Sequence, residues 1–279
     1  MILFSHGYGG FTEQNNDLCQ YLAGEGYIIA SIGHSYEASE TVYTDGTSVK
    51  FDNSLYLKMF RPFIPAVIDL ARLRKKKLTD EEGTQCFDVH QNRYEAFVVK
   101  RVKDWAEDDR FVLRHIHAMN EDPDSFLYRR IDFTNGTGIT GHSYGGALAY
   151  YHCMYDEEIS CGVNIDGGLF GSYGEDINPR PFMQVVHPGN ENVVSRSRIF
   201  HEGPVHYMVF TDTEHNGFTD KKLVSKQVSE VGRSDPELTL DTLNEAHAAF
   251  FDRYLKQADT ENRLPLPVDL KLLERYDVL

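Results

Sequence analysis

The five-residue segment GHSYG, centred on Ser143, is the feature that most constrains the fold of this chain. It fits the pattern G-x-S-x-G, in which a serine lies on a sharp turn between a strand and a helix. Gly141 and Gly145 suit such a turn, because side chains at its two ends would collide with the strand or the helix. A short apolar stretch at residues 138–140 precedes the segment, and residues 147–155 follow with a helical pattern. The pattern therefore predicts a strand, a tight turn and a helix, with the Ser143 hydroxyl exposed on the turn.

Short apolar segments alternate with helical stretches along the whole chain. The segments expected to form strands are residues 2–5, 27–32, 137–140, 162–165, 182–186 and 205–211. Apolar strands separated by helices predict an α/β fold with a mostly parallel central sheet and helices on both faces. With 279 residues, 41% of them hydrophobic, the chain is expected to form one domain over residues 1–279.

The stretch between the second and third predicted strands is too long for a single strand-to-strand connection. We expect part of it to be an insertion, a helical cap at about residues 41–91, with polar flanks around an apolar core at residues 55–73. Basic residues, among them Arg72 and Arg74, follow that core. The insertion is either a lid packed on the domain or a surface that docks on lipid. The acidity of the chain favours the lid.

Net charge and the chain ends restrict the partners and the location. A net charge of −15 disfavours nucleic acid or an anionic membrane as the principal partner. No transmembrane segment is found, and residues 2–5 form a predicted strand where a signal peptide would lie, so a cytoplasmic location is expected. Residues 260–279 are expected to be a tail on the surface. The oligomeric state is not predicted.

Ser143 needs partners, because a serine hydroxyl is a poor nucleophile at neutral pH. A histidine must take its proton, and a carboxylate must orient that histidine. Behind a turn of this kind, the acid and then the histidine follow the serine in the chain. Asp166 follows residues 162–165 at the predicted carboxyl end of a strand, where functional residues of parallel sheets gather. Glu191 is the alternative acid, and Asp166 could instead cap the turn before Gly167.

Several histidines downstream of Ser143 are candidate bases. His215 lies in a short polar loop after residues 205–211, from which it can reach over the turn. His187 ends another predicted strand and is the main rival. His206 lies within a predicted strand and is expected to be structural. The pattern favours His215.

Two backbone N–H groups are needed to stabilise a developing oxyanion. The first is expected from Tyr144, directly after the serine. The second is expected from Tyr8 in the segment HGYGG, which contains Gly7 and Gly9 and follows the first predicted strand. A glycine-rich turn can also bind phosphate, but this one lacks both the G-x-G-x-x-G spacing and a P-loop lysine.

In these segments the chain resembles the platelet-activating factor acetylhydrolase-like family of α/β-hydrolase serine esterases, the plasma type and its bacterial relatives. The matching segments are FSHGYGG (4–10), YIIASIGHSYEAS (27–39), RVKDWAEDDRFVL (101–113), GHSYGGALA (141–149), GVNIDGGLFG (162–171), EHNGFTD (214–220) and FFDRYL (250–255). The resemblance implies Ser143 as nucleophile, Asp166 as acid and His215 as base. It implies the Tyr8 and Tyr144 amides as oxyanion donors, with no metal and no cofactor.

The resemblance also implies a substrate class and exposes two departures. The expected substrate is a short-acyl ester, either phospholipid-like or small and soluble, cleaved through an acyl-enzyme. Family members usually have antiparallel strands before the HG strand, and the given sequence predicts neither these strands nor an export signal. A thioesterase or polyester hydrolase would use the same chemistry. A non-catalytic binding module with this fold is the alternative from another class, although the presence of all three triad residues favours an enzyme.

Overall fold

The computed structural model describes residues 1–59, 63–257 and 272–279. Its centre is a seven-stranded sheet with the order β2-β1-β5-β6-β7-β8-β9. The strands are β2 (Ile29–Ile32), β1 (Ile2–Ser5), β5 (Thr137–His142), β6 (Ile159–Ile165), β7 (Phe182–Val186), β8 (Val205–Phe210) and β9 (Leu273–Val278). Neighbouring strands are parallel from β2 to β8, and β9 is antiparallel to β8. The mostly parallel sheet predicted from the sequence is confirmed.

Helices cover both faces of this sheet, as the alternation of side chains along β1 illustrates. Ile2 and Phe4 belong to a core cluster with residues of α1 (Asn16–Gly24) and α9 (Pro236–Tyr254). Leu3 points to the other face and packs in a cluster with residues of α5 (Ala96–Glu121) and α6 (Tyr144–Tyr155). Alternate side chains of a strand point to opposite faces, so an apolar strand such as β1 can be buried on both. The α/β-hydrolase fold follows from this arrangement.

The expectation of a surface tail at residues 260–279 is wrong for its last part. Leu273–Val278 forms β9, which pairs with β8 in a register that places Tyr276 opposite Met208. The Tyr276 hydroxyl also lies 2.8 Å from Nδ1 of His206. The segment contains several charged residues, so its sequence resembles a loop, and only the pairing with β8 makes it a strand. The prolines of the expected tail lie outside the described residues.

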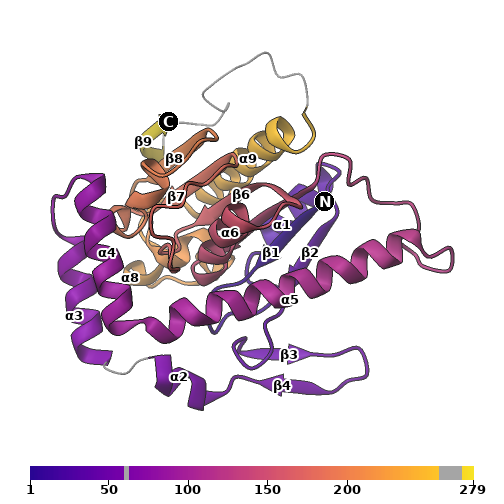
Figure 1. Cartoon of the computed structure of the whole chain (residues 1–279), viewed down its shortest axis with the longest axis horizontal. Helices are drawn as coiled ribbons and strands as arrows, with labels where there is room; N and C mark the ends of the chain where they lie inside the picture. Colours follow the sequence, from indigo (N-terminus) through magenta and orange to yellow (C-terminus); the bar gives the residue numbers. More distant parts are fainter. Residues whose placement is uncertain (60–62, 258–271) are drawn as a thin grey trace.

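The long connection between β2 and β5 forms several elements (Figure 1). They are β3 (Glu40–Val42), β4 (Ser48–Lys50), α2 (Asn53–Met59), α3 (Phe63–Arg74), α4 (Asp80–Tyr94) and then α5. β3 and β4 are an antiparallel hairpin, and Figure 1 shows α3 and α4 side by side at the amino-terminal end of α5. A capping box starts α4, because Thr79 and Glu82 bond to each other's backbone N–H.

Short helical segments complete the chain on the side of β7 and β8. They are η1 (Glu191–Val193), η2 (Ser195–Arg198), η3 (His215–Phe218), α7 (Lys221–Val224) and α8 (Val228–Val231). In the described part of the chain, every helix is too short or too polar to cross a lipid bilayer.

Candidate active site

Ser143 lies on a strained turn between β5 and α6. Its backbone has φ 57° and ψ −116°, the left-handed region that residues with a side chain rarely adopt. The turn is closed by a tight approach of backbones, since a Cβ on Gly145 would lie 2.0 Å from the carbonyl oxygen of Ser5. Only glycine fits at that position. The geometry of the predicted strand, turn and helix is therefore present at residues 137–155.

A continuous line of hydrogen bonds connects Ser143 to Asp166 through His215. Nε2 of His215 lies 2.9 Å from Oγ of Ser143, and its Nδ1 lies 2.6 Å from Oδ2 of Asp166. Ser143 follows β5, Asp166 follows β6 and His215 opens η3 beyond β8. Three segments far apart in the sequence thus meet at the carboxyl ends of parallel strands, where ligand sites of such sheets form.

The carboxylate of Asp166 is buried and fully hydrogen-bonded. Besides His215, Oδ2 faces Nδ1 of His187 at 2.6 Å, while Oδ1 accepts from the His187 backbone N–H at 3.0 Å. The side-chain amide of Asn190 also donates to Oδ1, at 3.1 Å. Burial opposes ionisation, but His187 and His215 together hold the pKa of the Asp166 carboxyl well below its usual range. Asp166 is therefore an anion at neutral pH.

The rival candidates named from the sequence occupy other positions. His187 contacts Asp166, but among the described residues no hydrogen bond joins it to Ser143. Glu191 lies on η1 with a carboxylate oxygen 3.6 Å from Nη1 of Arg275, away from the His215–Asp166 contact. The structure thus brings together Ser143, Asp166 and His215, and it adds His187 as a second partner of the acid.

His142, beside the serine, contacts the backbone of His215. Its Nε2 lies 2.8 Å from the carbonyl oxygen of His215, and its Nδ1 lies 2.7 Å from the side-chain amide of Gln14. Burial lowers the pKa of His142 to about 3, so the ring is neutral. A carbonyl only accepts, so Nε2 carries the proton and donates it, and Nδ1 accepts from Gln14. This bond fixes the backbone of the loop that carries the His215 ring.

The two expected oxyanion donors lie in the turn itself and in the loop that packs against it. Tyr144 is the first residue of α6, and the N–H groups of a helix's first turn have no acceptor within the helix. The HGYGG loop lies directly against the turn, because a Cβ on Gly7 would lie 3.1 Å from Cβ of Ser143. The rings of Tyr8 and Tyr144 are in edge contact at 5.8 Å. Tyr144 thus directly follows Ser143, and the loop that contains Tyr8 packs against the same turn.

Neither Asn190 nor Gln14 was among the residues selected from the sequence. Asn190 carried a weak signal, because it follows His187 in the polar loop after β7, at a strand end. Gln14 carried none, since it lies in the loop before α1 and reaches His142 only in the folded chain.

Among the described residues, one group of potential metal ligands is close-set: Asp166, His187 and His215, with ligand atoms within 4.8 Å of one another. Both imidazoles are already hydrogen-bonded to Oδ2 of Asp166 through Nδ1. The arrangement is accounted for by these hydrogen bonds.

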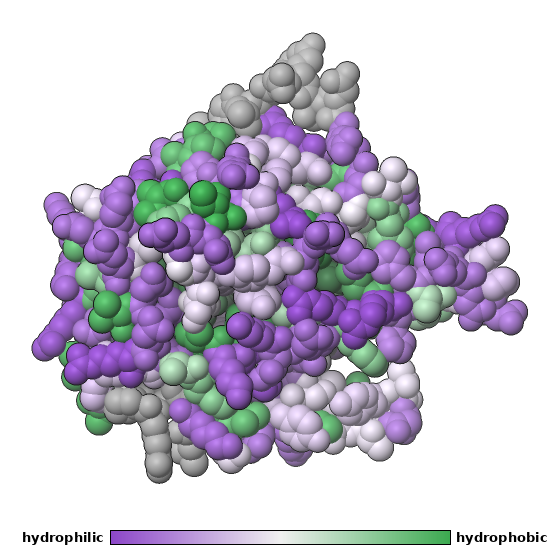
Figure 2. Space-filling model, in the orientation of Figure 1, coloured by the Kyte–Doolittle hydropathy of each residue, from purple (hydrophilic) through white to green (hydrophobic). Residues whose placement is uncertain are grey.

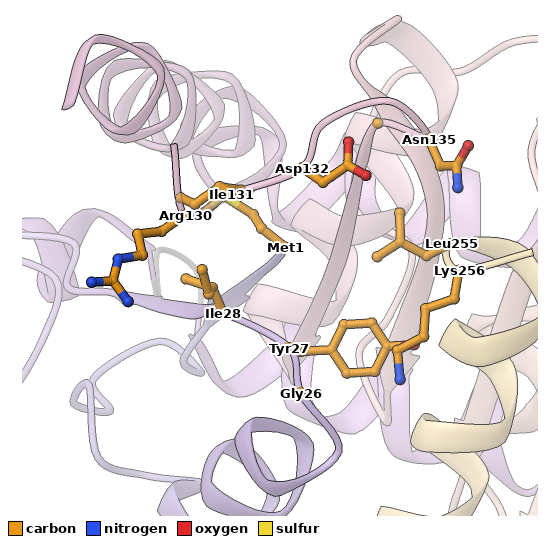
Figure 3. A pocket seen from close by; sticks show the side chains of 11 residues that line it. Met1, Gly26, Tyr27, Ile28, Arg130, Ile131, Asp132, Asn135, Leu255 and Lys256 are labelled. Carbon is orange, nitrogen blue, oxygen red and sulfur yellow. The ribbon is translucent and has the colours of Figure 1, made fainter. Parts of the chain in front are cut away.

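A separate hollow of about 310 Å³ lies near the amino ends of the strands (Figure 3). Its lining includes Met1, Tyr27, Ile28 and Ile131, which precede or begin strands, whereas Ser143 and Asp166 follow strands. In a parallel sheet, the amino ends of the strands and their carboxyl ends lie on opposite sides of the molecule. The hollow in Figure 3 is therefore separate from the serine and its partners.

Comparison with known proteins identifies relatives of the whole chain. The family model described as "Platelet-activating factor acetylhydrolase, isoform II" matches residues 1–265. A platelet-activating factor acetylhydrolase of Cavia porcellus is 24% identical over 303 residues, covering 100% of this chain and 63% of that protein. One of Gallus gallus is 21% identical and covers 91% of this chain and 62% of that protein. The chain thus spans less than two thirds of the length of these relatives.

Among solved structures, a ferulic acid esterase from Streptomyces cinnamoneus superposes with a TM-score of 0.67. The match covers 92% of this chain and 67% of that one at 19% sequence identity. At this identity the likeness establishes the fold alone.

Proposed function

Because the chain belongs to the family of platelet-activating factor acetylhydrolase isoform II, we propose that it is a serine carboxylic ester hydrolase. The observation that carries this proposal is the hydrogen-bonded line from Ser143 through His215 to Asp166. The proposed roles are nucleophile for Ser143, general base for His215 and orienting acid for Asp166. All three side chains are present with the distances that acyl transfer requires.

In the proposed reaction, Oγ of Ser143 attacks the ester carbonyl while Nε2 of His215 takes its proton. The negative charge that forms on the carbonyl oxygen is stabilised by the backbone N–H groups of Tyr8 and Tyr144. His215 then gives the proton to the leaving alcohol, and an acyl-enzyme remains on Ser143. A water molecule, deprotonated by His215, attacks the acyl group and releases the carboxylic acid.

Asp166 supports both halves of this cycle without changing its own protonation. Its carboxylate accepts from Nδ1 of His215, which leaves Nε2 unprotonated and facing Ser143. When His215 becomes positively charged, the nearby anion stabilises it. Because its carboxyl pKa lies well below the usual range, Asp166 stays charged throughout.

We further propose that residues 41–91 form a cap over this site. The Phe51 ring contacts Tyr8 at 5.7 Å, beside the proposed oxyanion site. The Phe87 ring contacts Phe170 at 5.4 Å, in the loop that follows Asp166. The segment thus touches two of the loops that carry proposed site residues, the one with Tyr8 and the one that begins at Asp166. We propose that a site covered in this way takes a short-acyl ester.

The outer side of this segment bears on whether the substrate is lipid-like. On α3, Ile64, Val67 and Ile68 are exposed, and they recur at helical spacing. Figure 2 shows that hydrophobic groups on the visible face occur as separate patches on a largely hydrophilic surface. We therefore propose a lid with peripheral lipid contact at most, and both phospholipid-like and small soluble esters as substrates. The cytoplasmic location expected from the sequence stays a prediction.

The proposal is tested by hydrolysis of p-nitrophenyl esters from acetyl to palmitoyl. The wild type is expected to turn over acetyl esters fastest, with rates falling as the acyl chain lengthens. Ser143→Ala is expected to fold normally and to lose several orders of magnitude in kcat with every ester, as triad knockouts do. Turnover by Ser143→Ala at the wild-type rate would refute the proposal. A folded wild type that cleaves no ester would favour the non-catalytic binding module.

A further inference from the structure

The acid of the proposed triad has two imidazole partners where the reaction requires one. Nδ1 of His187 and Nδ1 of His215 both lie 2.6 Å from the same oxygen, Oδ2 of Asp166. An ionised carboxylate only accepts, so both nitrogens must carry the proton and donate it. The roles assigned to Ser143, Asp166 and His215 leave this second imidazole unexplained.

The second partner is held in place by the pairing of β6 with β7. Ile165 lies opposite Val185, and the Asp166 backbone N–H donates to the carbonyl oxygen of Val185 at 2.8 Å. In this register Asp166 continues opposite Val186, and His187 lies one residue further along the same strand end. The residue is buried, with 8% of its surface exposed, so its ring is confined beside the carboxylate.

Oδ1 and Oδ2 of Asp166 each accept two hydrogen bonds. Oδ1 accepts from the His187 backbone N–H and from the Asn190 side chain, and Oδ2 accepts from the two imidazoles. Three of the four donors come from residues 187–190. A carboxylate oxygen has two lone-pair sites. On Oδ2 of Asp166, His215 donates to one of these sites and His187 donates to the other.

We propose that His187 is a positioning residue, which fixes the orientation of Asp166 and shares the charge of Oδ2 so that His215 is held less tightly in its protonated form. This inference rests on the proposed function, because it concerns how the acid acts on the base. His187 acts through Asp166 and does not touch the reacting atoms.

The sharing has a consequence for the pH dependence of hydrolysis. The titratable groups that face the Asp166–His215 pair are His187 and His142, and His142 contacts the His215 ring with centroids 4.6 Å apart. His142 also donates to the His215 carbonyl, and it is unchanged in the variants below. Removing the His187 donor leaves more negative charge on Oδ2 facing His215, which favours the imidazolium form. The acid limb of kcat/KM should then move to higher pH.

Two variants of near-equal size separate the donor from the bulk of the ring. His187→Asn keeps an N–H donor at the same distance along the side chain, whereas His187→Leu fills the space without one. For His187→Leu we expect kcat to fall about 10- to 100-fold, as for loss of a hydrogen bond to a charged group. Its acid limb should move upward by about one pH unit. His187→Asn should recover most of both losses.

The outcomes distinguish this inference from the proposed function. An acid limb and a kcat in His187→Leu equal to those of the wild type would refute the positioning role, provided Ser143→Ala is inactive. Equal losses in His187→Leu and His187→Asn, with an unmoved acid limb, would show a merely structural role and also refute it. An active Ser143→Ala would instead refute the proposed function. If His187→Leu does not fold, as judged by its thermal transition, His187→Ala provides the same comparison against His187→Asn.

Discussion

Asp166 differs from Ser143 in what each contributes to the folded chain. The serine hydroxyl contacts Nε2 of His215, whereas the aspartate is buried and accepts four hydrogen bonds from His187, Asn190 and His215. Its backbone also adopts a positive φ of 58°. A buried carboxylate in this setting both orients the His215 ring and holds two strand ends together.

Asp166→Asn should therefore lose activity and stability at once. An asparagine has one acceptor oxygen where the carboxylate has two, so donors from His187 or Asn190 are left unpaired. We expect kcat to fall by about 10⁴-fold, as for the same change in a serine protease triad. The free energy of unfolding at pH 7 should fall by roughly 1.5–3 kcal/mol, the magnitude for one hydrogen bond to a charged group.

The contribution of the Asp166 carboxylate to the free energy of unfolding depends on pH. The carboxyl pKa of Asp166 is lower in the folded chain than its unfolded value of 3.8, so its stabilising contribution is present above that value. The contribution is lost as the pH falls through the folded pKa. Urea unfolding of wild type and variant should therefore differ most at pH 7, and the difference should begin to shrink only as the pH falls below about 4 toward the folded pKa. Equal unfolding midpoints at pH 7, with Ser143→Ala as the reference, would contradict the account.

Residue patterns allowed part of this site to be predicted and not the rest. Ser143, Asp166 and His215 each lie after an apolar strand, and the parallel sheet brings such ends to one edge. The double occupancy of Oδ2 could not be predicted, because it depends on the register between β6 and β7. His187 was considered as a base competing with His215, yet it contacts the acid instead. The catalytic roles themselves stay predictions.

At the scale of elements, the contact between α6 and β1 fixes the turn. A Cβ on Gly145 would meet the Ser5 carbonyl oxygen at 2.0 Å and the His6 carbonyl oxygen at 2.7 Å, both of them backbone atoms that cannot rotate away. The start of α6 would have to move off the sheet, and Ser143 with it. The helix and Ser143 are thus positioned by the same close approach.

Gly145→Ala should destabilise the fold and impair ester hydrolysis together. We expect a loss of about 1–3 kcal/mol in unfolding free energy, typical of overpacking, and a fall in kcat because the hydroxyl is displaced. Gly24→Ala is the matched control: a Cβ there meets nothing within 4 Å, and the residue ends α1. That change should be neutral or slightly stabilising. Thermal unfolding of both variants measures the two changes in stability. A Gly145→Ala protein as stable and active as the wild type would contradict the packing described.

Elements with a strong local pattern were predicted more easily than those made by pairing. The strands β1, β5, β6, β7 and β8 are apolar runs, and the alternation of strand and helix indicates a parallel sheet. The hairpin of β3 and β4 and the edge strand β9 have polar sequences, and each is defined by its partner strand. Their hydrogen-bonding partners, more than their own composition, determine their conformation.

At the scale of the whole molecule, the sheet and its helix layers serve to bring distant segments together. Ser143, Asp166 and His215 come from three loops, and the serine and the histidine that bonds to it are 72 positions apart in the sequence. The HGYGG loop after β1 and the helix-rich segment at residues 41–91 reach the same edge of the sheet. The central claim is that these parts make one serine reactive in a chain that holds many other serines.

Labelling with a fluorophosphonate probe, followed by peptide mass spectrometry, tests this claim most directly. The probe phosphonylates a serine that a histidine activates, so the wild type should carry one label, on the peptide containing Ser143. Ser143→Ala should carry none, and His215→Gln should be labelled far more slowly while remaining folded. A folded wild type with Ser143 unlabelled, or with the label on another serine, would contradict the account.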